Sequence, residues 1–144
     1  MKVDNMSEKK KLALVVESGT IDKLYCAFIL AQTAASLDME VHAYFTFFGL
    51  MMLKKGEMDK AGLPETYKQF EEPMRKRLKE MKYPTPYEML KGAKATGNLK
   101  IYACTPTMQM FGIKPDDLIP EVDSAAGAAT ILSIASDANV TLFI

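Results

Sequence analysis

The chain has 144 residues, of which 49% are apolar and 25% are charged, which suits one globular domain with a sizeable core. Its 18 basic and 18 acidic residues cancel, and the zero net charge argues against a nucleic-acid binder, which normally has a basic excess. Two cysteines, no secretory signal pattern and no apolar run long enough for a bilayer argue against a disulfide framework and a membrane span. We therefore expect a cytoplasmic protein with reduced thiols.

The first third of the chain predicts a βαβ unit. Residues 12–16 (LALVV) are a compact apolar run typical of a strand buried on both faces. Residues 18–20 follow as a turn, and Thr20 is the expected N-cap of a helix that ends near Asp38. Residues 41–47 are rich in β-branched and aromatic side chains and predict a second strand. This order implies a parallel sheet with a right-handed crossover.

The middle of the chain is more charged and reads as helical. Residues 49–55 predict a short, methionine-rich helix, and residues 56–98 predict a helical insertion that is too small and too charged to hold its own core. Residues 85–88 (TPYE) have the form of a capping box with proline at the first helical position. A preceding apolar stripe is interrupted by Pro73, which should break or restart its helix. The stripe comprises Tyr67, Phe70, Met74, Leu78 and Met81.

Strands and helices alternate again in the last third. The predicted elements are a strand over 99–104, a helix begun by Thr105 and Pro106 and ended by Gly112, a short strand over 118–122, a helix capped by Asp123 and Ser124, and a final strand over 140–144. The whole pattern predicts a single α/β domain over 1–144. Its expected architecture is a three-layer α/β/α sandwich with a mostly parallel five-stranded sheet.

This architecture points to Cys104 as a candidate site. Open parallel sheets bind ligands outside the carboxyl ends of their strands, and Cys104 is the only residue predicted there that is nucleophilic without elaborate activation. A thiol at a helix N-terminus is favoured as the thiolate, which is the reactive form. Position alone leaves a reactive thiol and an inert, space-filling thiol equally open. Cys26, inside the first helix, is expected to be a packing residue.

Several sharper sites are not supported. Cys104 lacks the second cysteine of a C-x-x-C pair, and the only histidine, His42, lies within a predicted strand, which argues against a Cys–His pair. One histidine and two scattered cysteines are poor zinc ligands, so no metal is expected. Residues 18–20 could cradle a phosphate, but the glycine-rich nucleotide motifs are missing, so no nucleotide cofactor is expected. Phosphate-ester or nucleotide binding at this turn remains an open hypothesis for the function.

Three blocks of the sequence carry a resemblance to a known family. They are "SGTIDKLYCAFILAQTAASLDMEVHAYFTFFGL", "YACTPTMQMFGI" and "PEVDSAAGAATIL", and together the match runs from residue 11 to 144. The chain resembles the DsrE/DsrF-like family, in particular its stand-alone DsrE-related branch. The resemblance implies the DsrEFH-like sandwich fold and assembly into homo-oligomers. It also implies sulfur carriage, in which a cysteine receives sulfane sulfur or a thiosulfonate from a relay partner such as a TusA-like protein.

Carried over by position, the resemblance makes Cys104 the active cysteine and implies a sulfurtransferase-like role. No second cysteine lies in residues 93–114, so release of the cargo would need a partner thiol. We expect Thr105 to cap the helix and contact the cargo, Phe48 and Gly49 to form the opposite wall, and Met108 to shield the cargo from water. Ser18 and Gly19 complete the expected binding site. The alternative is a non-catalytic oligomeric α/β module that binds a partner protein or small ligand in the same cleft.

Overall fold

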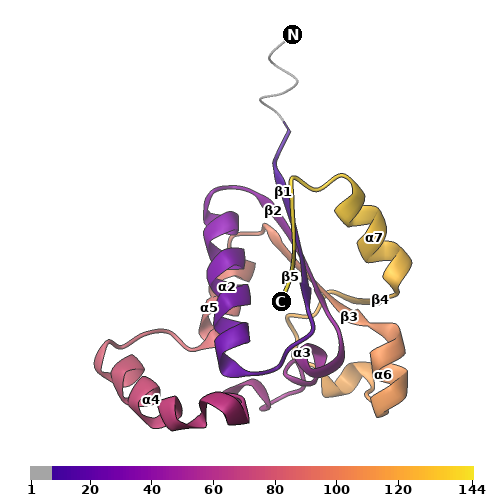
Figure 1. Cartoon of the computed structure of the whole chain (residues 1–144). Coiled ribbons are helices and arrows are strands. Elements are labelled where there is room, and N and C mark those ends of the chain that lie inside the picture. Colours follow the sequence, from indigo (N-terminus) through magenta and orange to yellow (C-terminus); the bar gives the residue numbers. More distant parts are fainter. Residues whose placement is uncertain (1–7) are drawn as a thin grey trace.

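A five-stranded parallel sheet forms the centre of the molecule (Figure 1). The computed structural model describes residues 8–144, so the first seven residues of the predicted domain lie outside the described part. The strand order is β4-β3-β2-β1-β5, and every pairing is parallel, which confirms the predicted α/β sandwich. The strands are β1 (Lys11–Val16), β2 (Glu40–Phe45), β3 (Leu99–Cys104), β4 (Ser124–Ala126) and β5 (Val140–Phe143).

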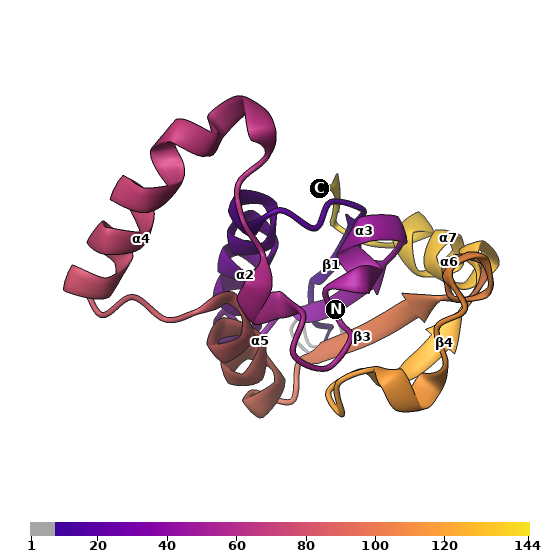
Figure 2. The same cartoon turned by 90° about the horizontal axis from the view of Figure 1, so that it is seen from below.

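Helices cover both faces of the sheet, and two more lie at its carboxyl edge (Figures 1 and 2). On one face lie α2 (Ile21–Ser36) and α5 (Pro86–Ala95), which pack against each other, and on the other lies α7 (Ala128–Ser136). The short helices α3 (Phe47–Met51) and α6 (Thr105–Phe111) follow the carboxyl ends of β2 and β3. None of the helices within residues 8–144 is long and apolar enough to cross a bilayer.

The core lies mainly between the sheet and the helices α2 and α5. Side chains alternate across a strand, so Leu14 and Val16 point to the same face as Phe45 of the neighbouring strand, and all three are fully buried. Phe28 of α2 stacks on Phe45 with ring centroids 6.1 Å apart. Leu24 and Phe28 therefore lie on the buried face of this helix.

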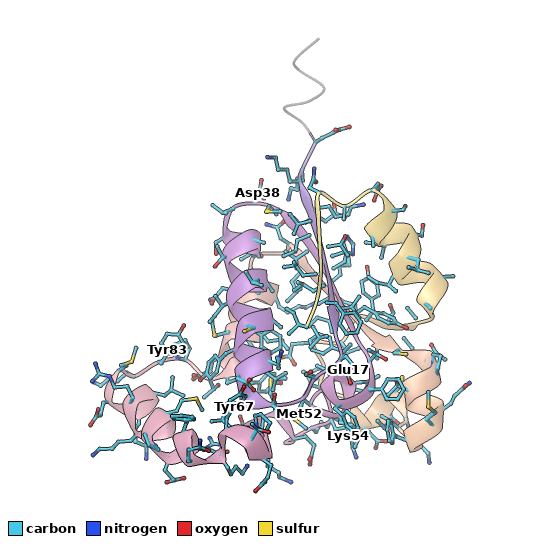
Figure 3. All side chains as sticks on the ribbon, in the orientation of Figure 1. Glu17, Asp38, Met52, Lys54, Tyr67 and Tyr83 are labelled. Carbon is cyan, nitrogen blue, oxygen red and sulfur yellow. The ribbon has the colours of Figure 1, made fainter. Side chains whose placement is uncertain are left out.

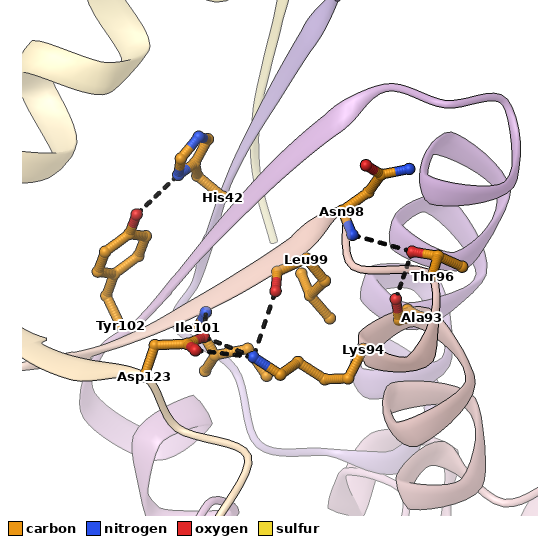
Figure 4. Close-up of polar contacts among 9 residues, drawn as sticks. All are labelled: His42, Ala93, Lys94, Thr96, Asn98, Leu99, Ile101, Tyr102 and Asp123. Carbon is orange, nitrogen blue, oxygen red and sulfur yellow. Dashed lines mark hydrogen bonds and ion pairs between the residues drawn. The ribbon is translucent and has the colours of Figure 1, made fainter.

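The predictions for residues 118–126 are wrong. No strand spans 118–122, and Ser124 belongs to β4 rather than to a helix cap, with Gly127 as the N-cap of α7. Asp123 explains the difference, because its carboxylate accepts hydrogen bonds from the Ile101 N–H (2.7 Å) and from Lys94 (2.7 Å), which Figure 4 shows. These contacts hold the chain at the edge of β3, so the next three residues pair with that strand.

The boundary after β2 also lies earlier than predicted. The strand ends at Phe45, and Thr46 is the N-cap of α3, although the β-branched and aromatic run continues to Phe47. The Thr46 N–H donates to the carbonyl of Val16 and the Gly49 N–H donates to the carbonyl of Glu17, which turns the chain across the end of β1. These tertiary hydrogen bonds override the local strand propensity.

The segment between α3 and α5 contains an arm, residues 64–85, that stands apart from the sandwich (Figure 2). The arm contains a 3-10 helix (Glu65–Phe70) and α4 (Glu71–Glu80), neither of which has a fully buried residue. The helix restarts at Glu71, so Pro73 lies in its first turn, where no intrahelical N–H is needed. The capping box over 85–88 is confirmed, because the Thr85 hydroxyl and the Glu88 carboxylate each accept the other residue's N–H.

Glu71 anchors the base of the arm. Its carboxylate accepts hydrogen bonds from the Leu63 N–H (2.7 Å), Lys68 (3.1 Å) and Arg75 (3.3 Å). The Leu63 N–H has the largest effect, and together with the two cations it lowers the pKa of Glu71 to about 2.

We expect Glu71→Gln to lower the thermal midpoint of unfolding at pH 7. A carboxylate whose pKa is lowered by folding stabilises the fold above its unfolded pKa of 4.5 and loses that effect as the pH falls toward 2. The difference between wild type and variant should therefore shrink over this interval, as measured by thermal unfolding at several pH values. A difference that stayed constant down to pH 2 would contradict this account.

Candidate functional site

Cys104 lies where β3 ends and α6 begins, as predicted. It is the N-cap residue of α6, and its side chain is buried, with 6% of its surface exposed. Pairing of β2 with β3 places Tyr44 opposite Tyr102, two residues before the cysteine. Because side chains alternate across strands, Tyr44 and Cys104 share the sheet face opposite to α2.

Three hydroxyl groups surround the thiol. They belong to Tyr44 on β2, Thr46 at the start of α3 and Thr107 in the first turn of α6. Tyr44 is 5% exposed and Thr107 is fully buried, so these groups act in an environment from which water is largely excluded. Hydrogen bonds to an ionised group are stronger there than at the surface.

The surroundings of Cys104 favour the thiolate. Burial has the largest single effect and raises the pKa of the thiol, because it penalises the charged form. The hydroxyls of Thr107, Thr46 and Tyr44, together with the backbone N–H of Thr107, outweigh burial and lower the pKa below the ordinary value of 9.0. Burial and the contact with Cys104 raise the pKa of Tyr44, so its hydroxyl keeps the proton that it donates.

The hydroxyls of Thr46 and Thr107 bond each other, which limits what they can donate to the thiol. The Thr107 hydroxyl accepts a hydrogen bond from the Phe47 N–H (3.0 Å), and its oxygen lies 3.1 Å from the Thr46 hydroxyl oxygen. Two hydroxyls carry two hydrogens, and one of these lies between them, so the other is free to be donated to the sulfur. Phe47 has a positive φ of 43°, which is a strained backbone conformation for a bulky residue. In this conformation its N–H donates to the Thr107 hydroxyl.

We expect Tyr44→Phe to raise the pKa of Cys104. The change removes one donor to the thiolate and leaves the ring in place, so the charged form loses stabilisation. Tyr102→Phe is the matched control, because Tyr102 lies on the same sheet face but its hydroxyl bonds His42 (2.7 Å), as Figure 4 shows. Thiolate absorbance against pH, measured in a Cys26→Ser background, distinguishes the two. If the pKa of Cys104 were the same in both variants, Tyr44 would not be a donor to the thiolate.

Thr105 directly follows Cys104, and Met108 lies about one helical turn after it in α6. Thr105 is the first residue of α6 and not its cap, which is Cys104 itself. Thr105 and Met108 line a cavity of about 430 Å³ that also includes Ala125 of β4. Met108 is buried and also borders a second cavity of about 460 Å³ next to Leu118. Both cavities are lined by residues of α6 and β4 and lie next to the helix that Cys104 caps.

Gly19 and Gly49 bring the turn after β1 close to α3, which contains Phe48, and Ser18 lies in the same turn with its N–H donating to the carbonyl of Ile144 (3.3 Å). A Cβ atom on Gly49 would lie 2.4 Å from the carbonyl oxygen of Val16, and one on Gly19 would lie 2.5 Å from that of Phe48. These glycines therefore permit a close backbone approach. The hydroxyl that α3 directs to the thiol comes from Thr46, two residues before Phe48.

Cys26 is exposed, so the expectation that it packs in the core is wrong. It lies two residues after Leu24 and two before Phe28, both of which point to the sheet. With 3.6 residues per turn, this offset directs Cys26 to the opposite side of the helix. His42 uses both ring nitrogens, one with Tyr102 (2.7 Å) and one with Glu40 (2.6 Å), so neither faces Cys104.

Tyr44, Thr46 and Thr107 are site residues that were not predicted from the sequence. Alternation along β2 placed Tyr44 and Thr46 on one face, and Thr107 lies three residues after the cysteine, so part of the signal was present. The pairing of β2 with β3, which brings these hydroxyls to the sulfur, could not be derived from that pattern. Within residues 8–144, no group of three or more histidine, cysteine, aspartate or glutamate side chains is arranged to hold a metal ion.

Comparisons with known proteins agree on one family. The model of the DsrE/DsrF/DrsH-like family matches residues 8–87 and 64–143. Sulfur carrier protein DsrE2 of Allochromatium vinosum is 31% identical, over 95% of this chain and 99% of its own length. The uncharacterized protein YrkE of Bacillus subtilis is 30% identical, over 95% of this chain and 98% of its own.

A solved structure extends the comparison of folds. MTH1491 of Methanobacterium thermoautotrophicum, a protein of unknown function, superposes with a TM-score of 0.63 over 94% of this chain and all of its own. Only 12% of the aligned residues are identical, so this likeness concerns the fold alone.

Proposed function

The chain belongs to the DsrE/DsrF/DrsH-like family, and from that membership we propose that it is a sulfur carrier that holds its cargo on Cys104. The observation that carries the proposal is the buried thiol at the carboxyl end of β3, among three hydroxyl groups that lower its pKa. A lowered pKa increases the fraction of thiolate at a given pH, and the thiolate is the nucleophile in sulfur exchange. The 31% identity to a protein named as a sulfur carrier supports the same role.

The proposed loading step is a thiol exchange. The Cys104 thiolate attacks the terminal sulfur of a donor persulfide, the donor's S–S bond breaks, and its other sulfur leaves as a thiolate. Cys104 then carries a persulfide, which is itself an anion near neutral pH. With tetrathionate as donor, thiosulfate leaves and Cys104 keeps a thiosulfonate. The one free hydroxyl hydrogen of the Thr46–Thr107 pair is available to either cargo, and the reverse exchange with a partner thiol releases the cargo.

The proposed partner is a sulfur-relay protein of the TusA-like kind. Phe47, Phe48 and Phe111 form an exposed aromatic cluster, with ring centroids 6.3 to 6.4 Å apart, at the helices that flank Cys104. Exposed aromatic side chains supply much of the binding energy at protein interfaces. The cluster therefore supports docking of a partner close to the thiol.

Self-association is a further part of the proposal. Three members of the arm's apolar stripe, Tyr67, Phe70 and Met81, are 52% to 57% exposed, so packing among residues 8–144 leaves about half of each side chain uncovered. Large exposed apolar side chains that gather in one segment are typical of interaction surfaces. We place a homo-oligomer contact at this arm, and light scattering of wild type and Phe70→Ser tests it.

The test of the function is loading followed by transfer. Wild type is incubated with polysulfide or, separately, with tetrathionate, and intact-protein mass spectrometry records the gain of sulfur or of a thiosulfonate. The loaded protein is then mixed with a TusA-type carrier, which should gain the mass that this protein loses. A protein that gains no mass from either donor would favour the alternative of a non-catalytic binding module.

A further inference from the structure

A groove of about 750 Å³ runs between α2 and the arm, separate from the residues around Cys104. Its volume falls within the range of small-molecule sites, about 300–1,000 Å³. The body of the protein contributes Ile21, Tyr25 and Met58, and the arm contributes Leu78 and Tyr83. Figure 3 shows Tyr83 on the segment that leads from α4 back to α5.

Two tyrosines give the groove an aromatic wall. The rings of Tyr25 and Tyr83 lie with centroids 5.7 Å apart at an angle of 58°. The Tyr25 hydroxyl donates to the carbonyl of Pro84 (3.0 Å), so its polar group is satisfied and its ring remains as apolar surface. Such a wall suits a flat or branched apolar body.

Hydrogen bonds hold the arm to the body on both sides of the groove. At the start of α4, Arg75 donates to the carbonyl of Ala61 (2.7 Å) and pairs with Glu71 (3.3 Å). At its end, the bond between Tyr25 and Pro84 joins the arm to α2. These contacts join the arm to the body at two places, so the groove between them has a fixed position in the fold.

The charge of the lining favours an anion. Four basic side chains border the groove, Arg75, Lys76, Lys79 and Lys82, against the two acidic residues Asp59 and Glu72. Arg75 is occupied by its structural contacts. Among the ion pairs of residues 8–144, none involves the three lysines. Their ammonium groups are therefore free to meet a negative charge.

We propose that this groove binds an amphipathic organic anion, with its apolar body against Tyr25 and Tyr83 and its sulfonate, carboxylate or phosphate group at Lys76 and Lys79. The site does not use Cys104, so it stands or falls independently of sulfur carriage. The chemistry requires both parts of the ligand, because apolar contact supplies area and the lysines select the sign of the charge.

A matched pair of fluorescent probes tests both parts. The probe 8-anilinonaphthalene-1-sulfonate carries the anion, and N-phenyl-1-naphthylamine has the same aromatic frame without it. The sulfonate should bind wild type more tightly than the neutral probe. Lys76→Gln with Lys79→Gln should weaken sulfonate binding about tenfold, which is about 1.4 kcal/mol, and leave the neutral probe unchanged, since the lysines interact with the anionic group. Tyr83→Ala should weaken both probes.

Two control variants locate the binding. Arg77→Gln removes a positive charge from the same helix, but Arg77 lies outside the lining and pairs with Glu80 at the surface, so sulfonate binding should not change. Phe143→Ser removes an apolar side chain that is 72% exposed on the edge strand, and it should also have no effect. Equal affinities of the two probes, equal losses in Arg77→Gln and the lysine variant, or loss in Phe143→Ser would each overturn the proposal.

Discussion

Replacing Cys104 with serine is expected to abolish loading with sulfane sulfur at this position. A serine hydroxyl is not ionised near neutral pH and cannot form the S–S bond, although its volume is close to that of the thiol. The three surrounding hydroxyls lower the pKa of the cysteine, and without the sulfur they have no anion to stabilise. Intact-protein and peptide mass spectrometry after treatment with polysulfide and with tetrathionate measures the loss.

Cys26→Ser is the matched control for this experiment. Cys26 is exposed on the outer side of α2, away from the hydroxyl groups around Cys104, so its replacement should leave loading of Cys104 intact. Any mass gained at Cys26 in wild type should be minor and removable by a reductant. If the Cys104→Ser protein gained as much sulfur as wild type, the proposed site would be wrong even if the protein remained a carrier.

Replacing Gly49 with alanine is expected to destabilise the fold by about 1–3 kcal/mol, the usual range for overpacking. The added Cβ would lie 2.4 Å from the carbonyl oxygen of Val16. Because the carbonyl is part of β1 and the Cβ is fixed to the backbone of α3, the helix must shift. Because Thr46 and Phe47 lie at the start of this helix, the shift should also displace donors from the thiolate and raise the pKa of Cys104.

Gly92→Ala provides the same chemical change without the clash. Its added Cβ would meet only the end of the flexible Gln32 side chain, and Gly92 lies inside α5, where alanine has the higher helix propensity. We expect this variant to gain about 0.5–1 kcal/mol in the free energy of unfolding. Urea denaturation of both variants measures the contrast, and equal stabilities would show that the contact of α3 with β1 is not tight.

Local pattern was sufficient for much of the fold. Residues 99–104 alternate and end in a proline-containing helix start, so β3, α6 and the position of Cys104 between them followed from propensity, proline placement and Gly112 at the helix end. The capping box over 85–88 was equally local, since its partners lie three residues apart. The resemblance to the DsrE/DsrF-like family added the sulfur chemistry, which propensity and spacing did not contain.

Tertiary structure alone decided the features that depend on contacts between distant residues. Asp123 turned a predicted cap into an edge strand by bonding Ile101, which lies 22 residues away. The pairing of β2 with β3 brought Tyr44 and Thr46 to a thiol about sixty residues later in the chain, and no local pattern records which strands are neighbours. The burial of Cys26 was predicted wrongly because α2 is apolar on both sides, so hydrophobicity alone did not determine which side would be buried.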